Sequence, residues 1–336
     1  EEIIDEVPIE NIVITEIGDL LPTPKKQLVN FVVKNIKKMI PKFHLPQAYS
    51  FNEALQLGKK SKHQLPASSP EDVAFLQYTG GTTGVSKGAM LTHRNIISNM
   101  LQVGEWMAPL LKTGGETVVT ALPLYHIFSL TVNCFCFMHI GATNLLITNP
   151  KDIPLFIKIL KTNKFTSFTG VNTLFNALMQ HPDFTSIDFS HLKISVAGGM
   201  ALQKHVAMQW KRLTHTAVIE GFGLTETSPV ACCNPIDGSD RVGTIGVPLP
   251  STEIMVVDDA GHELGLNQEG ELCIKGPQVM KGYWNRPQDT ADIMLGDWLK
   301  TGDIAVIDDD GFAKIVDRKK DMILVSGFNV FPNEIE

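Results

Sequence analysis

Between residues 72 and 235, short apolar runs alternate with stretches that have helical periodicity. This alternation predicts a mostly parallel sheet, because parallel strands need a crossover connection and a helix usually supplies it. We therefore predict an α/β core of mostly parallel strands with flanking helices. Examples of the expected strands are residues 73–76, 118–119, 145–147 and 194–196, and examples of the expected helices are residues 92–101, 155–161 and 173–179.

The pattern changes after Gly243, where short runs alternate between apolar and polar residues. Asp310-Gly311 and Gly261 supply turn chemistry between such runs. Short alternating strands joined by Asp-Gly or Gly-rich turns are typical of antiparallel hairpins. We therefore predict a small antiparallel β subdomain. Its expected strands are residues 253–257, 271–274, 304–307 and 313–316.

Residues 28–41 have apolar side chains at helical spacing, surrounded by lysines. Such a pattern predicts an amphipathic helix. A basic helix in an acidic protein can lie on anionic lipid, or it can pack on its own domain with a solvated lysine face. The second interpretation is favoured because runs of charge are usually solvated. The apolar residues are Leu28, Phe31, Val32, Ile36, Met39 and Ile40, and the lysines are Lys25, Lys26, Lys34, Lys37, Lys38 and Lys42.

The net charge of −7 argues against nucleic-acid binding, which normally uses a basic surface. The five cysteines lack zinc-ligand spacing and are interpreted as reduced thiols of a cytoplasmic protein. The most apolar run, residues 127–140, is too short and too polar to span a bilayer. The chain also opens without a secretory signal, so a cytoplasmic location is expected.

Residues 78–88, YTGGTTGVSKG, follow an expected strand and combine glycines with hydroxyl side chains and Lys87. Glycines let backbone N–H groups converge on an anion, and the hydroxyls and the cation add further donors. The loop is not a Walker A motif, because Ser86 stands directly before Lys87 where that motif needs glycine. A flexible hairpin turn is the alternative, but it would not need four hydroxyls and a lysine. The loop is therefore predicted to hold phosphates.

This loop resembles the signature of the adenylate-forming enzymes, which include acyl-CoA synthetases, luciferases and peptide-synthetase adenylation domains. Segments between the motifs (THRN, ITNP and GYWNRP) resemble those of bacterial long-chain fatty-acid–CoA ligases. The resemblance implies the large domain of the adenylate-forming fold and covers essentially the whole chain. Further motifs follow in the family's order: PLYH at 123–126, VAGGM at 196–200, GFGLTE at 221–226, TGD at 301–303, DRKKD at 317–321 and SGFNVFPNEIE at 326–336.

The reaction that this resemblance implies has two steps, and it belongs to fatty-acid and lipid metabolism. A fatty carboxylate attacks the α-phosphate of ATP to give acyl-adenylate and pyrophosphate, and the thiol of CoA then displaces AMP. The implied cofactor is Mg²⁺, with ATP and CoA as cosubstrates. The carboxylate is already anionic, so the barrier is charge repulsion, which fixed donors and cations lower.

The resemblance assigns residues to each part of the site. The catalytic residues are Lys87, His126, Thr225, Glu226 and Arg318, and the Mg²⁺ ligands are Thr82 and Glu226. The nucleotide-binding residues are Thr79, Gly80, Gly81, Thr82, Thr83, Gly84, Gly198, Gly199, Met200, Glu220, Gly221, Phe222, Thr225, Asp303, Arg318 and Lys320. The acyl-binding residues are Tyr125, His126, Leu130, Val171 and Gly223.

Three positions refine these assignments. His126 stands where amino-acid-activating relatives carry Asp, which disfavours an amino-acid substrate. Phe222 stands where the family usually has Tyr, so ring stacking survives without a hydroxyl contact. Leu130 stands where some long-chain members place a gating Trp, so a gate of that kind is not expected and the preferred chain length is left open.

Residues 317–320 match the family hinge, with Lys320 at the hinge position, and residues 326–336 resemble the start of a C-terminal domain. In the family that domain carries a catalytic lysine, which this chain does not reach. We therefore expect a fragment that binds ATP weakly and makes essentially no acyl-CoA. The expected division is residues 1–70 (an incomplete N-terminal portion with the basic helix), 71–237 (the α/β core), 238–319 (the β subdomain) and 320–336 (the hinge and the start of the next domain).

Other functions stay open from sequence alone. They are another acyl-activating ligase of the same superfamily, a luciferase-like oxygenase, and a non-catalytic nucleotide- or lipid-binding module. Peripheral contact with the inner face of the cell membrane and a homodimer also stay open. The expected partners are a fatty acid, ATP and CoA.

Overall fold

The computed structural model describes residues 4, 6–79, 86–318, 323–325 and 328–330. The chain divides into two compact units, residues 1–68 and residues 69–336, and each is described by itself. Among the described residues, no helix is long and apolar enough to cross a membrane.

The described residues of the first unit form two short strands, two α-helices and a π-helical turn. Strand β1 (Val13–Ile14) pairs in parallel with β2 (Tyr49–Ser50). Helix α2 (Phe51–Lys60) begins with a capping box, in which Ser50 Oγ accepts from the Glu53 backbone N–H at 3.3 Å and a Glu53 carboxylate oxygen accepts from Ser50 N–H at 2.8 Å.

The basic helix is shifted from its predicted position of 28–41. It comprises α1 (Lys25–Phe31) and a π-helical turn, η1 (Val32–Ile36). The predicted end at residue 41 was wrong, because the helix stops before Lys38, whose φ of +49° is a left-handed conformation that no right-handed helix can contain. Most of its predicted apolar residues are exposed: Leu28, Phe31, Ile36 and Met39.

The second unit is built on a seven-stranded sheet of order β11-β10-β9-β8-β7-β5-β6. The five strands from β6 to β9 are parallel, whereas β10 and β11 run antiparallel to their neighbours. The strands are β5 (Thr117–Thr120), β6 (Thr143–Leu146), β7 (Ser167–Gly170), β8 (Ile194–Ala197), β9 (Val218–Gly223), β10 (Val230–Cys233) and β11 (Val247–Pro248).

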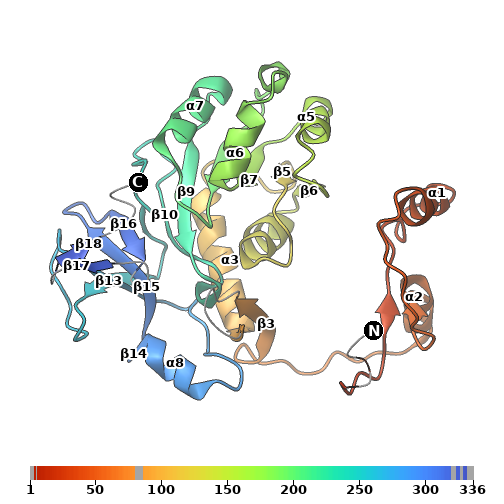
Figure 1. Cartoon of the computed structure of the whole chain (residues 1–336), viewed down its shortest axis with the longest axis horizontal. Helices are drawn as coiled ribbons and strands as arrows, with labels where there is room; N and C mark the ends of the chain where they lie inside the picture. Colours follow the sequence, from red (N-terminus) through yellow and green to blue (C-terminus); the bar gives the residue numbers. More distant parts are fainter. Residues whose placement is uncertain (1–3, 5, 80–85, 319–322, 326–327, 331–336) are drawn as a thin grey trace. The chain divides into compact units, whose positions relative to one another are not determined.

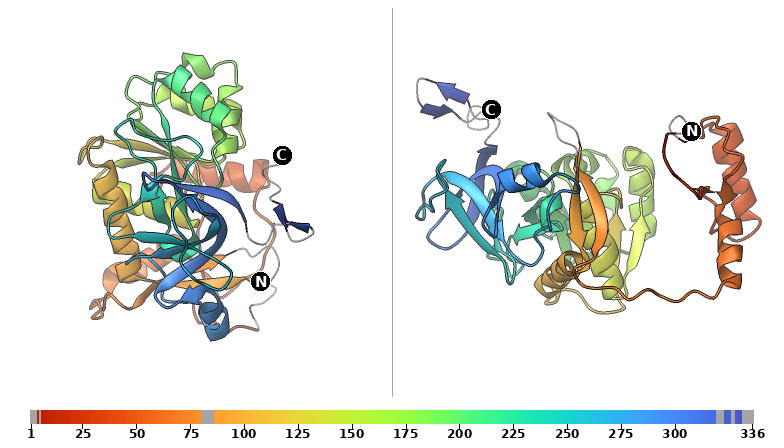
Figure 2. Two further views of the ribbon diagram at one scale, coloured as in Figure 1. Left: turned by 90° about the vertical axis from the view of Figure 1, so that its left-hand side faces the viewer. Right: turned by 90° about the horizontal axis from the view of Figure 1, so that it is seen from below.

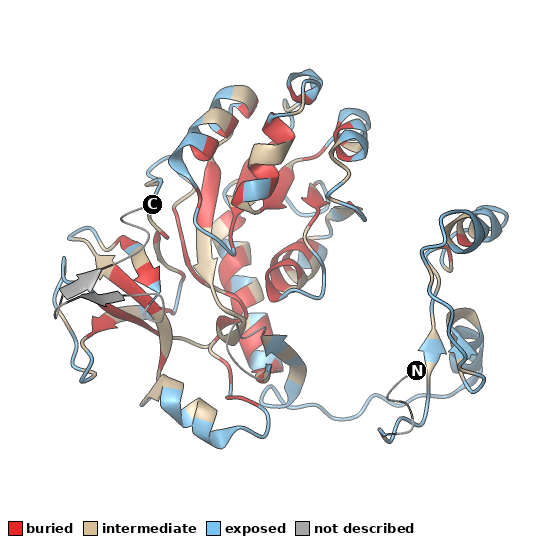
Figure 3. Ribbon diagram, in the orientation of Figure 1, coloured by how far each residue is buried: buried red, intermediate tan, exposed pale blue. Residues whose placement is uncertain are grey.

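Both faces of this sheet are buried, and most of its strand residues are coloured as buried in Figure 3. On β5, Val118 belongs to one apolar cluster and the next residue, Val119, to another, since successive strand side chains point to opposite faces. Trp210 packs against four phenylalanine rings on the Val119 side. This arrangement confirms the predicted α/β fold of mostly parallel strands with flanking helices (Figure 1).

The helices divide between the two faces according to these clusters. On the Val119 side lie α5 (Ile153–Thr162), α6 (Asn172–Met179), the short η3 (Phe184–Ser186) and α7 (Lys204–Thr214). On the Val118 side lie α3 (His93–Met107), the π-helix η2 (Ser129–Cys136) and α4 (Phe137–His139).

The predicted antiparallel subdomain is confirmed. Strands β12 (Glu253–Val257), β13 (Gly270–Lys275), β15 (Trp298–Ile307) and β14 (Met294–Leu295) form one sheet, with β16 (Ala313–Arg318) paired to β15. Helix α8 (Pro287–Ile293) precedes β14.

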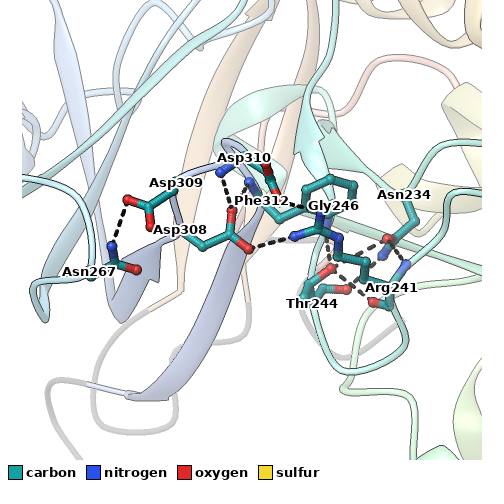
Figure 4. Close-up of polar contacts among 9 residues, drawn as sticks. All are labelled: Asn234, Arg241, Thr244, Gly246, Asn267, Asp308, Asp309, Asp310 and Phe312. Atoms are coloured by element: carbon teal, nitrogen blue, oxygen red, sulfur yellow. Dashed lines mark hydrogen bonds and ion pairs between the residues drawn. The ribbon is translucent and has the colours of Figure 1, made fainter.

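The predicted Asp310-Gly311 turn joins β15 to β16 and is held by Arg241. The Arg241 guanidinium bonds Asp308 at 2.8 Å and Asp310 at 2.6 Å, and it lies 4.0 Å from the ring centre of Phe312 (Figure 4). Gly311 has a φ of +83°, which glycine adopts readily and other residues rarely do.

The predicted phosphate loop connects two antiparallel strands, β3 (Val73–Thr79) and β4 (Lys87–Thr92), which lie side by side in Figure 2. The two strands that flank the loop therefore form a hairpin, as the alternative interpretation expected. A hairpin can still carry a phosphate-binding loop at its tip. Residues 80–85 lie outside the described part. A second two-stranded pair comprises β17 (Ile323–Val325) and β18 (Phe328–Val330).

Candidate active site

A cavity of about 1000 Å³ opens in the second unit, at the carboxyl ends of β8 and β9. Ligands of open α/β sheets bind at such strand ends. Many residues predicted from motifs far apart in the sequence line this one cavity. They are Thr79, Tyr125, His126, Gly198, Gly199, Gly221, Phe222, Gly223, Thr225, Glu226, Asp303 and Arg318.

Gly198 and Gly199 follow β8 and form part of the wall. A Cβ on Gly198 would lie 3.2 Å from the carbonyl oxygen of Gly221 and 3.2 Å from the Phe128 ring. Gly199 has a φ of +78°, a conformation that favours glycine. Gly198 therefore allows the backbone of β9 and the Phe128 ring to approach closely, whereas Gly199 is required by its backbone conformation.

Glu226 lies in η4 (Thr225–Thr227), directly after β9. The hydroxyl of the buried Tyr283 donates to its carboxylate at 2.5 Å. Burial and then the Glu226 charge raise the pKa of Tyr283, so its hydroxyl keeps its proton. Among the described residues, no group of three or more His, Cys, Asp or Glu side chains could hold a metal. Glu226 fits Mg²⁺ nonetheless, because Mg²⁺ usually takes one or two carboxylates together with substrate phosphates.

Asp303 and Arg318 form a cross-strand pair on β15 and β16. The Arg318 Nε lies 3.6 Å from an Asp303 carboxylate oxygen. The Asp303 side chain is nearly buried whereas that of Arg318 is 58% exposed, so the carboxylate is fixed while the guanidinium can reorient toward a ligand. A fixed carboxylate can accept from two neighbouring hydroxyls, as those of a ribose.

His126 follows the β5 strand end and faces the same cavity. The backbone N–H of Phe128 donates to His126 Nδ1 at 3.3 Å. Desolvation by the surrounding protein lowers the pKa of His126, although the residue is exposed at the cavity wall. The imidazole is therefore neutral near pH 7 and carries its proton on Nε2, from which it can donate to an anionic group.

Several predicted residues do not line the cavity. Lys87 forms an ion pair with Asp289 at 2.5 Å and lies 5.2 Å from the centre of the Tyr283 ring. The residues outside the wall are Lys87, Leu130, Val171, Met200 and Glu220. The predicted residues Gly80, Gly81, Thr82, Thr83, Gly84 and Lys320, which include one of the two expected metal ligands, lie outside the described residues.

Glu220 lies on β9 with its carboxylate buried beside the cavity. One oxygen accepts from the Leu202 backbone N–H at 3.1 Å, and the other has no hydrogen-bond partner within the described part of the chain. Burial raises the pKa of Glu220 to about 7. The carboxyl thus anchors the segment that follows Gly199, and it loses or gains its proton near neutral pH.

We expect Glu220→Gln to flatten the pH dependence of stability. The folded state binds a proton more tightly than the unfolded state, whose pKa is 4.5. The free energy of unfolding therefore falls as pH rises from about 4.5 to about 7, by about 3 kcal/mol, and stays low above that range. Urea unfolding of the intact protein at pH 5 and pH 8 measures this difference. The exposed control Glu263→Gln should keep the wild-type pH dependence, and a Glu220→Gln variant that also keeps it would contradict the prediction.

Sequence reasoning missed the apolar wall of the cavity. Val103, Trp106 and Met107 contribute to it from α3, as do Val132 and Leu249 from elsewhere. The signal was present as helical periodicity in α3. Apolar residues that line a cavity and those that fill a core have the same pattern, so periodicity alone could not separate them.

A family model described as AMP-binding enzyme matches residues 5–284, and the chain belongs to that family. This membership confirms the predicted adenylate-forming superfamily.

Within that family, the chain is similar to bacterial long-chain-fatty-acid–CoA ligases. It is 56% identical to the one from Escherichia coli O157:H7 over 336 residues, which are 100% of this chain and 60% of the relative. The chain thus spans about three fifths of the length of the curated relatives that it matches.

The chain is also similar to two solved structures. ATP-bound MatB from Rhodopseudomonas palustris is 33% identical with a TM-score of 0.71, over 80% of this chain and 52% of that one. The O-succinylbenzoate coenzyme A synthetase MenE from Bacillus subtilis, in complex with ATP and magnesium ion, is 27% identical with a TM-score of 0.70, over 86% of this chain and 59% of that one.

Proposed function

We propose that the intact protein is a long-chain-fatty-acid–CoA ligase that forms AMP. It would convert a fatty acid and ATP to acyl-adenylate and pyrophosphate, and then transfer the acyl group to CoA. The observation that carries this proposal is one cavity that joins Glu226, Asp303 and Arg318 to an apolar wall. The similarity to curated ligases of that name, and to solved relatives in complex with ATP, supports it.

The polar residues would divide the nucleotide among them. Gly198, Gly199, Gly221 and Phe222 enclose the adenine, with Glu220 behind them, and Asp303 accepts from the ribose hydroxyls. Arg318 contacts the nucleotide, and Thr225 donates to the α-phosphate. Glu226, with Thr82, would hold Mg²⁺, which when bound neutralises phosphate charge. Fixed donors of this kind lower a barrier made of charge repulsion.

The apolar wall would take the fatty chain. Each methylene that leaves water for an apolar site contributes about 0.8 kcal/mol. The neutral His126 would donate from Nε2 to the reacting carboxylate without adding a fixed charge. Because His126 replaces the acidic residue of amino-acid-activating relatives, a substrate without an ammonium group is favoured.

The function is tested by pyrophosphate release from the intact protein with fatty acids of graded length. We expect KM to fall as the chain lengthens, up to the length that the cavity holds. Free amino acids and hydroxybenzoates should release little pyrophosphate. Equal release from acetate and a long-chain acid would contradict the proposed substrate class, and no release from any acid would favour a binding module instead.

We expect His126→Ala to act on the acid rather than on the nucleotide. Loss of one hydrogen bond to a charged group lowers kcat/KM for the fatty acid by about tenfold or more. The KM for ATP should change less than twofold, since His126 is not assigned to the nucleotide. Steady-state kinetics with each substrate varied measures both, and the exposed His205→Ala is the control. An effect on ATP alone would overturn this assignment.

The basic helix of the first unit carries a second candidate function, contact with an anionic membrane. Leu28, Phe31 and Ile36 are exposed beside lysines. We favour the alternative, that in the intact protein the helix packs on its own domain with a solvated lysine face, and we propose a cytoplasmic location. Flotation of the intact protein with phosphatidylglycerol vesicles distinguishes membrane contact from packing on protein. Only a protein whose basic helix binds the membrane would float with the vesicles and stop floating when the lysines of that helix are replaced.

Sedimentation of the intact protein tests the proposed homodimer.

A further inference from the structure

One extended segment, residues 280–284, connects the strand after the phosphate loop to the residue proposed to hold the metal. The Met280 N–H donates to the Glu226 carbonyl oxygen at 2.8 Å, and the Trp284 N–H donates to the Gly88 carbonyl oxygen at 2.8 Å. The strand that follows the predicted phosphate loop and the residue proposed to hold the metal are therefore joined through five residues of backbone.

Tyr283, in the middle of this segment, contacts both sides with its side chain. Its hydroxyl donates to Glu226 at 2.5 Å, and the Lys87 ammonium lies 5.2 Å from its ring centre. Its backbone N–H donates to the Thr290 hydroxyl at 2.9 Å, and its ring is buried. The phenol is thus held in one place from which it contacts a carboxylate and a cation.

The Lys87 ammonium is held on its other side by Asp289, at 2.5 Å. Four side chains therefore lie in a row: the Asp289 carboxylate, the Lys87 ammonium, the Tyr283 ring and the Glu226 carboxylate. Tyr283 lies between Lys87 and Glu226. Because the phenol is neutral, its hydroxyl holds the Glu226 carboxylate without placing another charge beside it. A hydrogen bond to a carboxylate is among the stronger polar contacts.

We infer that Tyr283 is a positioning residue for adenylation, whose hydroxyl fixes the rotation of the Glu226 carboxylate for Mg²⁺. The inference rests on the proposed role of Glu226. A metal ligand that is held by a neighbouring hydrogen bond loses less freedom when the metal binds, and such partners commonly change metal affinity when they are removed.

Tyr283→Phe in the intact protein tests this inference, because it removes the hydroxyl and keeps the ring under Lys87. We expect the Mg²⁺ concentration for half-maximal pyrophosphate release to rise about tenfold or more. Nucleotide binding measured without Mg²⁺ should change less than twofold. The exposed Tyr49→Phe is the matched control, and it should leave both quantities unchanged.

A merely structural role would lower the melting temperature or the amount of active protein without moving the Mg²⁺ midpoint, and that outcome would overturn the inference. If Tyr283→Phe unfolds, the same titration on Thr290→Val, which removes the hydroxyl that holds the Tyr283 backbone, decides instead: an unchanged midpoint overturns the inference. Glu226→Ala separates this failure from that of the proposed function. If Glu226→Ala is inactive while Tyr283→Phe has the wild-type Mg²⁺ midpoint, only the role of Tyr283 fails, whereas a fully active Glu226→Ala refutes the proposed role of Glu226 itself.

Discussion

Replacing Glu226 by Ala is expected to lower the rate of pyrophosphate formation by about a thousandfold, since metal stabilisation of transferring phosphates contributes several kcal/mol and each 1.36 kcal/mol is a factor of ten. The variant also leaves the buried Tyr283 hydroxyl without its acceptor. An unsatisfied buried donor costs about 1–3 kcal/mol, so some loss of stability is expected as well.

The measurement is single-turnover pyrophosphate release by the intact protein at saturating ATP, fatty acid and Mg²⁺. Circular dichroism and the melting temperature separate loss of folding from loss of chemistry. Glu105→Ala, an exposed glutamate on α3, is the matched control and should retain full activity. A folded Glu226→Ala variant with more than a tenth of the wild-type rate would exclude this residue as the principal metal ligand.

The runs named from the sequence identify β5, β6 and β8, because short apolar runs are local signals. Strands β7 and β9 were not named, and the expected strand at 73–76 is β3, which pairs antiparallel with β4 outside this sheet. The antiparallel pairing of β10 with β9 and β11 was not predicted. Strand direction depends on which distant segments meet, and neither periodicity nor composition records it.

The helix boundary failed for a related reason. Leu28, Phe31, Val32 and Ile36 continue their spacing into Met39, so periodicity predicted a longer helix. The chain instead turns at Lys38. Periodicity reports which face is apolar, whereas the end of a helix is set by backbone conformation at a single residue.

The sequence was enough to name motif residues that line the cavity, but not to predict the side chains that contact them. Glu226 and Asp303 could be named from the sequence because each stands at a fixed place in a motif, and both line the cavity. Tyr283 was only part of a resembling segment, since its role depends on a contact with a residue 57 positions away. Likewise, the sequence assigned Lys87 to phosphates but could not predict its ion pair with Asp289.

Gly223, which the resemblance assigns to the acyl site, lies in the wall of the cavity. Its surroundings show a second requirement. A Cβ there would lie 1.9 Å from the Pro229 carbonyl oxygen and 3.0 Å from the Val230 Cα, which are backbone atoms. Backbone cannot rotate away as a side chain can, so any larger residue must push β10 away from β9.

We expect Gly223→Ala to reduce the free energy of unfolding by about 3 kcal/mol or more, as severe overpacking does. The rate of pyrophosphate release should also fall, even under conditions in which the variant is folded. Thr225 and Glu226 follow shortly after this residue and would move with it. Urea unfolding and pyrophosphate release of the intact protein measure the two effects.

Gly104→Ala is the matched control for this prediction. Gly104 lies inside α3, and a Cβ there would meet nothing within 4 Å. Alanine is the better helix former, so this variant should be more stable by about 0.5–1 kcal/mol and fully active. If both variants were equally stable, the close approach of β10 to β9 would not be what requires glycine. If only Gly223→Ala is destabilised, the contact between the backbones of β9 and β10 is what requires glycine at this position, whereas a Gly223→Ala variant that keeps its stability and loses activity would assign the requirement to the substrate.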